Sequence, residues 1–308
     1  MDLRTSVGKS FLDLFTNDLS IKIEGTHSIL NLHILKIENN DFCYFELIEE
    51  LAENIISYSL SRKQIDTFKA EGKTAKLYRR AVEKLRQNID KPTDKSSGGE
   101  AGEILLYSFL ESHLQAPKIL TKLEIKTSSN DYAKGSDGIH LLKVSDTSYQ
   151  LIFGESKLNP NLKDSIYHAF DSIQNFITRS KNNIHHEIGL LDSQLCKEAF
   201  EKDLYDFIKS VVFPTASSSV TRDKAFGIFA GFEVKPTDEQ MKMTNDDFRK
   251  CIRDEIVNEV NAKLKHIQEK ITEHKLDGYS FYIYVFPFIK LDDARRKIID
   301  NLIHAKLN

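Results

Sequence analysis

The stretch Gly135-Ser136-Asp137-Gly138 and the run Tyr149–Lys157, which ends in Gly154-Glu155-Ser156-Lys157, decide the fold of this chain. Residues 139–144 and 149–153 between them are mostly apolar and read as strands, and the polar residues 145–148 are typical of a turn. If the turn centres on Asp146, the numbers of paired residues sum to about 292. Asp137 would then lie opposite Glu155 at the open end of a hairpin.

This open end would gather two carboxylates and a lysine. Side chains alternate along a strand, so Glu155 and Lys157 share one face while Ser156 points to the other. Neighbouring carboxylates repel each other unless a positive charge lies between them, and a hard divalent cation prefers oxygen ligands. We therefore interpret Asp137 and Glu155 as ligands of Mg²⁺ or Mn²⁺.

The chemistry that this cluster indicates is phosphodiester hydrolysis. A lysine beside a bound cation can hold the attacking water or neutralise a phosphate, and Lys157 is placed for that role. The alternative is that Asp137 is an ordinary turn residue and that Glu155 and Lys157 form a solvated strand end. Each motif is short enough to occur by chance, and it is their joint order that favours the metal site.

Composition restricts the binding partners. The chain of 308 residues has 43 basic and 46 acidic residues and a net charge of -3, so any surface that attracts nucleic acid must be local. Residues 62–95 form the most basic segment, with eleven Lys or Arg against five Asp or Glu. This segment is either a phosphate-binding surface or a solvated helix face.

Targeting and redox features are sparse. No apolar run is long enough to span a membrane and no signal-peptide core follows Met1, so we expect a cytoplasmic protein without a membrane partner. The cysteines, Cys43, Cys196 and Cys251, are widely spaced and predict neither a disulfide framework nor a zinc site.

The polar segment 90–99, which contains Pro92, Gly98 and Gly99, is the best candidate for a linker. We expect a boundary near residue 95, with an N-terminal α+β region over residues 1–95 that binds a partner or DNA, and a second domain over residues 96–308. The N-terminal region should contain two strands within residues 21–38, a helix from a cap at Asp41 to about Leu60, and two helices up to Gln87.

The second domain should be of the α/β class, with a central mixed sheet flanked by helices. Gly227 and Gly231 would allow close backbone approach within one of its strands. In chain order we expect a helix over 100–111, a strand over 120–127, the hairpin, an amphipathic helix over 162–178, a helix over 193–211, a strand over 225–234, a long charged helix over 238–273 with a break near Asn245, a strand over 279–289 and a closing helix over 292–306.

Glu103 lies on the buried side of the helix 100–111. A carboxylate is costly to bury without a partner, so Glu103 either caps the helix N-terminus or reaches into the metal site. Glu100 could do the same, and the sequence leaves the choice between them open.

The order of Glu103 on a helix, Asp137 opening a strand, and Glu155 and Lys157 closing the next strand before an amphipathic helix resembles the PD-(D/E)XK nuclease superfamily. Its core is similarly α-β-β-β-α. The proline that often precedes the aspartate is replaced by Ser136. This resemblance implies a restriction-endonuclease-like core with an N-terminal α+β region.

More narrowly, residues 98–107, 135–138 and 154–157 are similar to the HamA family, the nuclease subunits of the bacterial Hachiman anti-phage system. The resemblance covers mainly residues 95–180. It implies a magnesium-dependent deoxyribonuclease that acts on DNA during phage infection with a partner helicase, HamB. By position, Asp137 and Glu155 would bind the metal, Lys157 would assist the attacking water, and Glu103 would complete the site.

Two other classes of function compete with this one. A protein with the same fold could bind nucleic acid or a helicase without cleaving, or it could be an enzyme of RNA processing. The presence of Asp137, Glu155 and Lys157 together favours a nuclease, because a module that only binds does not need all three. The near-neutral net charge suggests that a helicase presents the strand.

Overall fold

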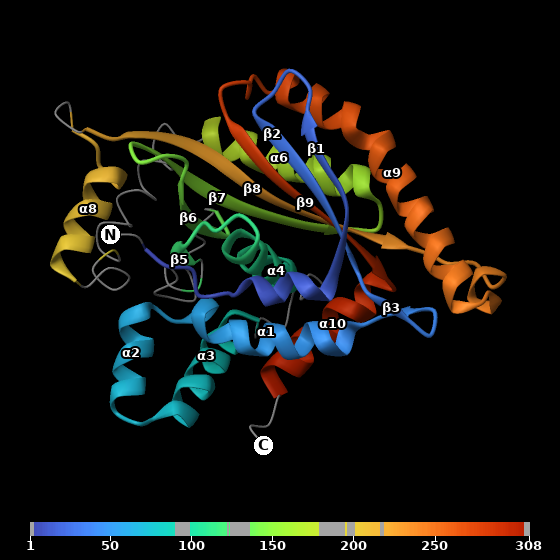
Figure 1. The fold of residues 1–308 in the computed structure, drawn as a ribbon, viewed down its shortest axis with the longest axis horizontal. Coiled ribbons are helices and arrows are strands. Elements are labelled where there is room, and N and C mark those ends of the chain that lie inside the picture. The colour runs from blue at the N-terminus through green and yellow to red at the C-terminus, as the bar shows by residue number, and fades with distance from the viewer. Residues whose placement is uncertain are drawn as a thin grey trace.

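The computed structural model describes residues 3–89, 99–121, 123, 136–178, 195, 201–215 and 219–304. Within them, a seven-stranded mixed sheet has the strand order β1-β2-β9-β8-β7-β6-β5 (Figure 1). Strands β2, β9, β8 and β7 are parallel, and antiparallel pairs flank them on both sides. The strands are β1 Phe15–Ile23, β2 Ser28–Leu35, β5 Lys118–Thr121, β6 Gly138–Lys143, β7 Ser148–Asn159, β8 Thr221–Val234 and β9 Ser280–Ile289, with a separate pair of β3 Ile37–Glu38 and β4 Asp41–Phe42.

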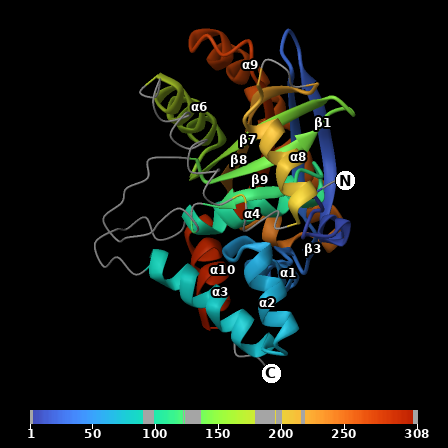
Figure 2. The ribbon, with the colours of Figure 1, turned by 90° about the vertical axis from the view of Figure 1, so that its left-hand side faces the viewer.

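Helices cover both faces of the sheet, as Figures 1 and 2 show. On one face, Leu106 and Leu110 of α4 lie over the spaces left by Gly154 and Gly227. On the other face, α6 packs its aromatic rings against the strands and also contacts α9. The helical elements are η1 Lys9–Leu14, α1 Tyr44–Ser59, α2 Arg62–Ala70, α3 Thr74–Ile89, α4 Gly99–Ser112, α6 Leu162–Thr178, α8 Lys202–Val212, η2 Gln240–Lys242, α9 Asn245–Glu273 and α10 Leu291–His304.

The central hairpin forms as the sequence predicts. Ile139 of β6 pairs with Phe153 of β7, which is the predicted register. α4, β5, β6, β7 and α6 follow one another in the predicted order, and α6 has the predicted bounds. The strand predicted over 120–127 is β5, which covers only Lys118–Thr121, and Leu123 is already helical. β7 continues past Lys157 to Asn159, because its pairing with the parallel strand β8 continues to that residue.

Several helix boundaries differ from those that the sequence predicts. The cap predicted at Asp41 is wrong: Cys43 is the N-cap of α1 and makes no side-chain cap bond. Asn39 and Asn40 both adopt positive φ, which closes a two-residue turn and places Asp41 in β4, where its carboxylate accepts a hydrogen bond from the Phe42 N–H. The long helix breaks as expected, since η2 comes first and Thr244 caps α9. The helix predicted over 193–211 corresponds, within the described residues, to α8, which begins at Lys202 and ends at Val212.

The N-terminal strands belong to the central sheet. β2 pairs in parallel with β9, with Leu30 beside Ile283, and β1 forms the edge beyond it.

The boundary predicted near residue 95 lies outside the described residues, so the division into two domains stays a prediction. No helix in the described part of the chain is long and apolar enough to cross a membrane. Cys43 and Cys251 are free thiols, and Cys196 lies outside the described residues.

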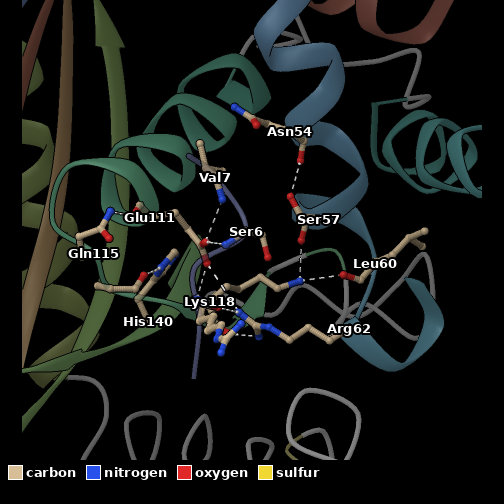
Figure 3. A network of polar contacts seen from close by, with 12 residues as sticks. Ser6, Val7, Asn54, Ser57, Leu60, Arg62, Glu111, Gln115, Lys118 and His140 are labelled. Carbon is tan, nitrogen blue, oxygen red and sulfur yellow. Dashed lines mark hydrogen bonds and ion pairs between the residues drawn. The ribbon is translucent and has the colours of Figure 1, made fainter. Parts of the chain in front are cut away.

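A buried charge network ties the N-terminal segment to α4 (Figure 3). The carboxylate of Glu111 is fully buried and accepts hydrogen bonds from the N–H groups of Ser6, Val7 and Lys118, the last at 2.6 Å. The Arg62 guanidinium lies 3.9 Å away and also donates to the Lys118 carbonyl at 2.8 Å. Burial raises the pKa of Glu111, although Arg62 and the backbone donors act against this. The network therefore holds α2, β5 and α4 together.

Close packing at Gly231 gives a test of this fold. A Cβ at this residue of β8 would lie 2.2 Å from Leu158 and 2.9 Å from Phe288. Gly231→Ala should therefore lower the free energy of unfolding by about 1–3 kcal/mol through overpacking. Gly278→Ala is the matched control, because a Cβ there meets nothing within 4 Å. Urea unfolding of both variants measures the difference, and equal stabilities would contradict the packing described here.

Candidate functional site

The hairpin fixes Asp137 at the start of β6 through two hydrogen bonds to β7. The Asp137 N–H donates to the Gly154 carbonyl at 2.8 Å, and its carboxylate accepts from the Ser156 N–H at 2.8 Å. Both bonds cross the ladder next to Glu155. The sequence prediction that Asp137 and Glu155 are neighbours at the open end of the hairpin is consistent with this geometry.

Glu155 and Lys157 share one face of β7, as alternation requires. The Lys157 ammonium contacts the Glu155 carboxylate directly. Phe153 on the same face packs against Phe176 of α6, and Ser172 of α6 lies near Glu155, so this face is the one that α6 covers. Ser156 points the other way, toward Gly102 of α4. The strand thus separates an ionic face from the face that packs on α4.

Glu103 approaches Asp137 from α4, which lies on the Ser156 side of β7. Its side chain is buried and accepts a hydrogen bond of 3.1 Å from the Tyr58 hydroxyl. Glu103, Tyr58 and Asp137 line a cavity of about 10 Å³, which is close to the space that one water molecule needs. Glu100 does not line this cavity. Of the two glutamates that the sequence left open, the structure brings Glu103 toward Asp137.

The electrostatics of Glu155 reflect its surroundings. Burial is the largest effect and the negative charge of Asp137 the second, and together they raise the pKa of Glu155 from 4.5 to about 7. Lys157 and Ser172 act in the opposite direction but do not cancel these effects. Two carboxylates that repel each other in a partly dry site form a local excess of negative charge.

The donor set suits a magnesium ion held by few protein ligands. Among the described residues, no three His, Cys, Asp or Glu side chains lie close enough together to enclose a metal ion. Mg²⁺ usually keeps several waters and binds through one or two carboxylates plus phosphate oxygens. Asp137 with Glu155, or Asp137 with Glu103 across the small cavity, offers such a pair. The chemistry of these donors therefore fits the cation.

Some basic side chains of segment 62–95 make contacts inside the protein, and others face the solvent. Arg62 takes part in the buried network around Glu111, and the Lys84 ammonium donates to the Ser59 carbonyl at 3.2 Å. Lys76 and Arg79 remain exposed on α3. Five further basic residues of the described part of this segment are also exposed, and any of the seven could touch a phosphate backbone: Lys63, Lys69, Lys73, Arg80 and Arg86.

Sequence reasoning missed Tyr58, Ser172 and His140. His140 lines the same cavity as Glu103, and burial lowers its pKa to about 4, so its ring is neutral at physiological pH. Its Nδ1 lies 2.8 Å from the Ala116 carbonyl. Of the three, only His140 carries a sequence signal, a polar side chain within an apolar strand, and that signal does not name a partner.

Comparison with protein-family models gives a match to the model HamA over residues 9–302. The chain belongs to the HamA family. HamA belongs to the Hachiman defence system, which has a partner component, so the chain has a role in that defence. The match also includes the N-terminal region, which the motifs at residues 95–180 did not reach. Searches of curated proteins and of solved structures found no match.

The raised pKa of Glu155 makes the stability of this HamA protein depend on pH. Because folded Glu155 holds its proton more tightly than the unfolded chain does, its contribution is complete below about pH 4.5 and is lost as pH rises through about 7. Glu155→Gln removes this loss. The difference in free energy of unfolding, Glu155→Gln minus wild type, should therefore rise by roughly 1–3 kcal/mol between about pH 5 and about pH 8.

Urea unfolding in the presence of EDTA measures this difference without bound metal. Parallel pH profiles for the wild type and Glu155→Gln would show that the folded state does not raise the pKa of this carboxyl group.

Proposed function

We propose that this HamA protein is a metal-dependent deoxyribonuclease that cleaves phosphodiester bonds as the effector of Hachiman defence. The observation that carries the proposal is the cluster of Asp137, Glu155 and Lys157 at the open end of one hairpin, with the pKa of Glu155 raised by burial and by Asp137. Perturbed carboxylates grouped with a lysine are typical of catalytic sites.

Each residue has a role that its position supports. Asp137 and Glu155 would hold Mg²⁺ or Mn²⁺, and Glu103 would complete the site from α4. The cation, when bound, would stabilise negative charge that develops on the phosphate. Lys157, whose ammonium already contacts Glu155, would hold the attacking water by hydrogen bonding and balance the charge of the scissile phosphate.

The arrangement of elements supports a PD-(D/E)XK core. α4 and α6 lie on opposite faces of the sheet, and β5, β6 and β7 come between them in the chain. This is the α-β-β-β-α order to which the sequence motifs correspond. Of the proposed ligands, Asp137 immediately precedes the second of these strands, Glu155 lies on the third and Glu103 on the first helix, as that superfamily would require.

Charge supports a dependence on a helicase partner, HamB. The net charge of -3 gives the isolated chain little attraction for DNA, and part of its most basic segment is used in packing. A helicase that delivers single strands would supply the missing affinity. Tight binding of DNA by the isolated chain at physiological salt would argue against this dependence.

Substitution of Lys157 tests the proposal. Lys157→Ala should abolish DNA cleavage while leaving the thermal unfolding of the protein nearly unchanged, because a site lysine contributes more to reaction than to packing. Lys143→Ala is the matched control, since Lys143 lies on the same hairpin near its turn and is partly exposed. It should cleave like the wild type.

The assay incubates purified protein, with and without HamB, with plasmid DNA or RNA in the presence of Mg²⁺ or EDTA. Wild-type cleavage that requires the metal and disappears in Asp137→Ala and Lys157→Ala supports the assignment. DNA binding without cleavage under all these conditions would favour the non-cleaving module, and cleavage of RNA alone would favour RNA processing.

A further inference from the structure

Tyr58 is the residue of the N-terminal region that enters the candidate site. It lies in the last turn of α1 and is 1% exposed. Its hydroxyl donates to the Glu103 carboxylate at 3.1 Å, and its ring packs beside Tyr107 with 5.5 Å between ring centroids. Burial and the charges of Glu103 and Asp137 raise the pKa of Tyr58, so the hydroxyl keeps its proton and remains a donor.

The turn that carries Tyr58 is held from two sides. The buried Lys118 ammonium of β5 donates to the carbonyls of Ser57 at 2.8 Å and Leu60 at 3.0 Å, as Figure 3 shows. Lys84 of α3 donates to the Ser59 carbonyl. Cations at the last carbonyls of a helix satisfy acceptors that would otherwise lack partners. The hydroxyl of Tyr58 is thereby fixed relative to α4.

We propose that Tyr58 is a positioning residue of the metal site, which orients the Glu103 carboxylate toward the cavity that it shares with Asp137. This inference rests on the proposed function. One carboxylate oxygen of Glu103 accepts the Tyr58 hydroxyl, and that contact restricts how the carboxylate can turn. Residues that hydrogen-bond to metal ligands commonly change metal affinity by about 10–100-fold when they are removed.

The same helix provides a matched control. Tyr44 lies in the first turn of α1, is buried, and exchanges hydrogen bonds of 3.1 and 2.9 Å with the carbonyl and N–H of Ile289. Each change to phenylalanine removes a buried hydroxyl, which makes two hydrogen bonds at Tyr44 and one at Tyr58, but only Tyr58 contacts a carboxylate of the site. A purely structural role predicts similar effects from both changes.

The test measures binding of Mn²⁺ alone to the full-length chain by electron paramagnetic resonance, with thermal unfolding of each variant as a check on folding. Tyr58→Phe should weaken Mn²⁺ binding by about 10–100-fold. Tyr44→Phe should bind like the wild type. In a Glu103→Gln background, Tyr58→Phe should have no further effect, because its contribution passes through Glu103.

The outcomes separate this inference from the proposed function. Wild-type protein that binds no Mn²⁺ overturns both. Wild-type binding that is unchanged in Tyr58→Phe, or weakened equally in Tyr44→Phe, overturns the positioning role and leaves the metal site standing. An additive loss in the Glu103→Gln background also overturns it.

Discussion

The burial of α4 is the constraint on which this structure depends. Every residue from Ala101 to Ser112 is buried, and two of them are glutamates. A buried carboxylate requires hydrogen-bond donors or cations, so the elements around α4 must supply them. Arg62 and backbone N–H groups supply Glu111, and Tyr58 contributes to Glu103. The packing around α4 is therefore set as much by charge as by apolar area.

The two ends of α4 differ in what surrounds their carboxylates. Near its C-terminal end, Glu111 accepts several backbone hydrogen bonds and has a guanidinium nearby, which is the pattern of a structural charge. Near its N-terminal end, Glu103 lines a small cavity with Asp137, whose charge also acts on Glu155. Carboxylates therefore come together there, and the cation of the proposed nuclease would offset their repulsion.

The N-terminal region takes part in both the sheet and the candidate site. β2 extends the sheet beside β9, and α1 brings Tyr58 to Glu103. The family match over residues 9–302 includes all of these elements. In the proposed nuclease, the N-terminal region would thus be a part of the structure that shapes the site, in addition to any role in binding DNA or a partner.

The sequence by itself determined the elements whose signals are local. A polar turn set the register of β6 and β7 and hence the proximity of Asp137 and Glu155, while apolar periodicity gave the bounds of α6. The cap at Asp41 failed because Asn39 and Asn40 form a turn that periodicity does not reveal. Tertiary structure alone placed Glu103, rather than Glu100, at the cavity that Asp137 lines, and brought Tyr58, 45 residues away in the chain, to the Glu103 carboxylate. Partners at such separations are chosen by how helices pack on a sheet, and no short stretch of sequence encodes that choice.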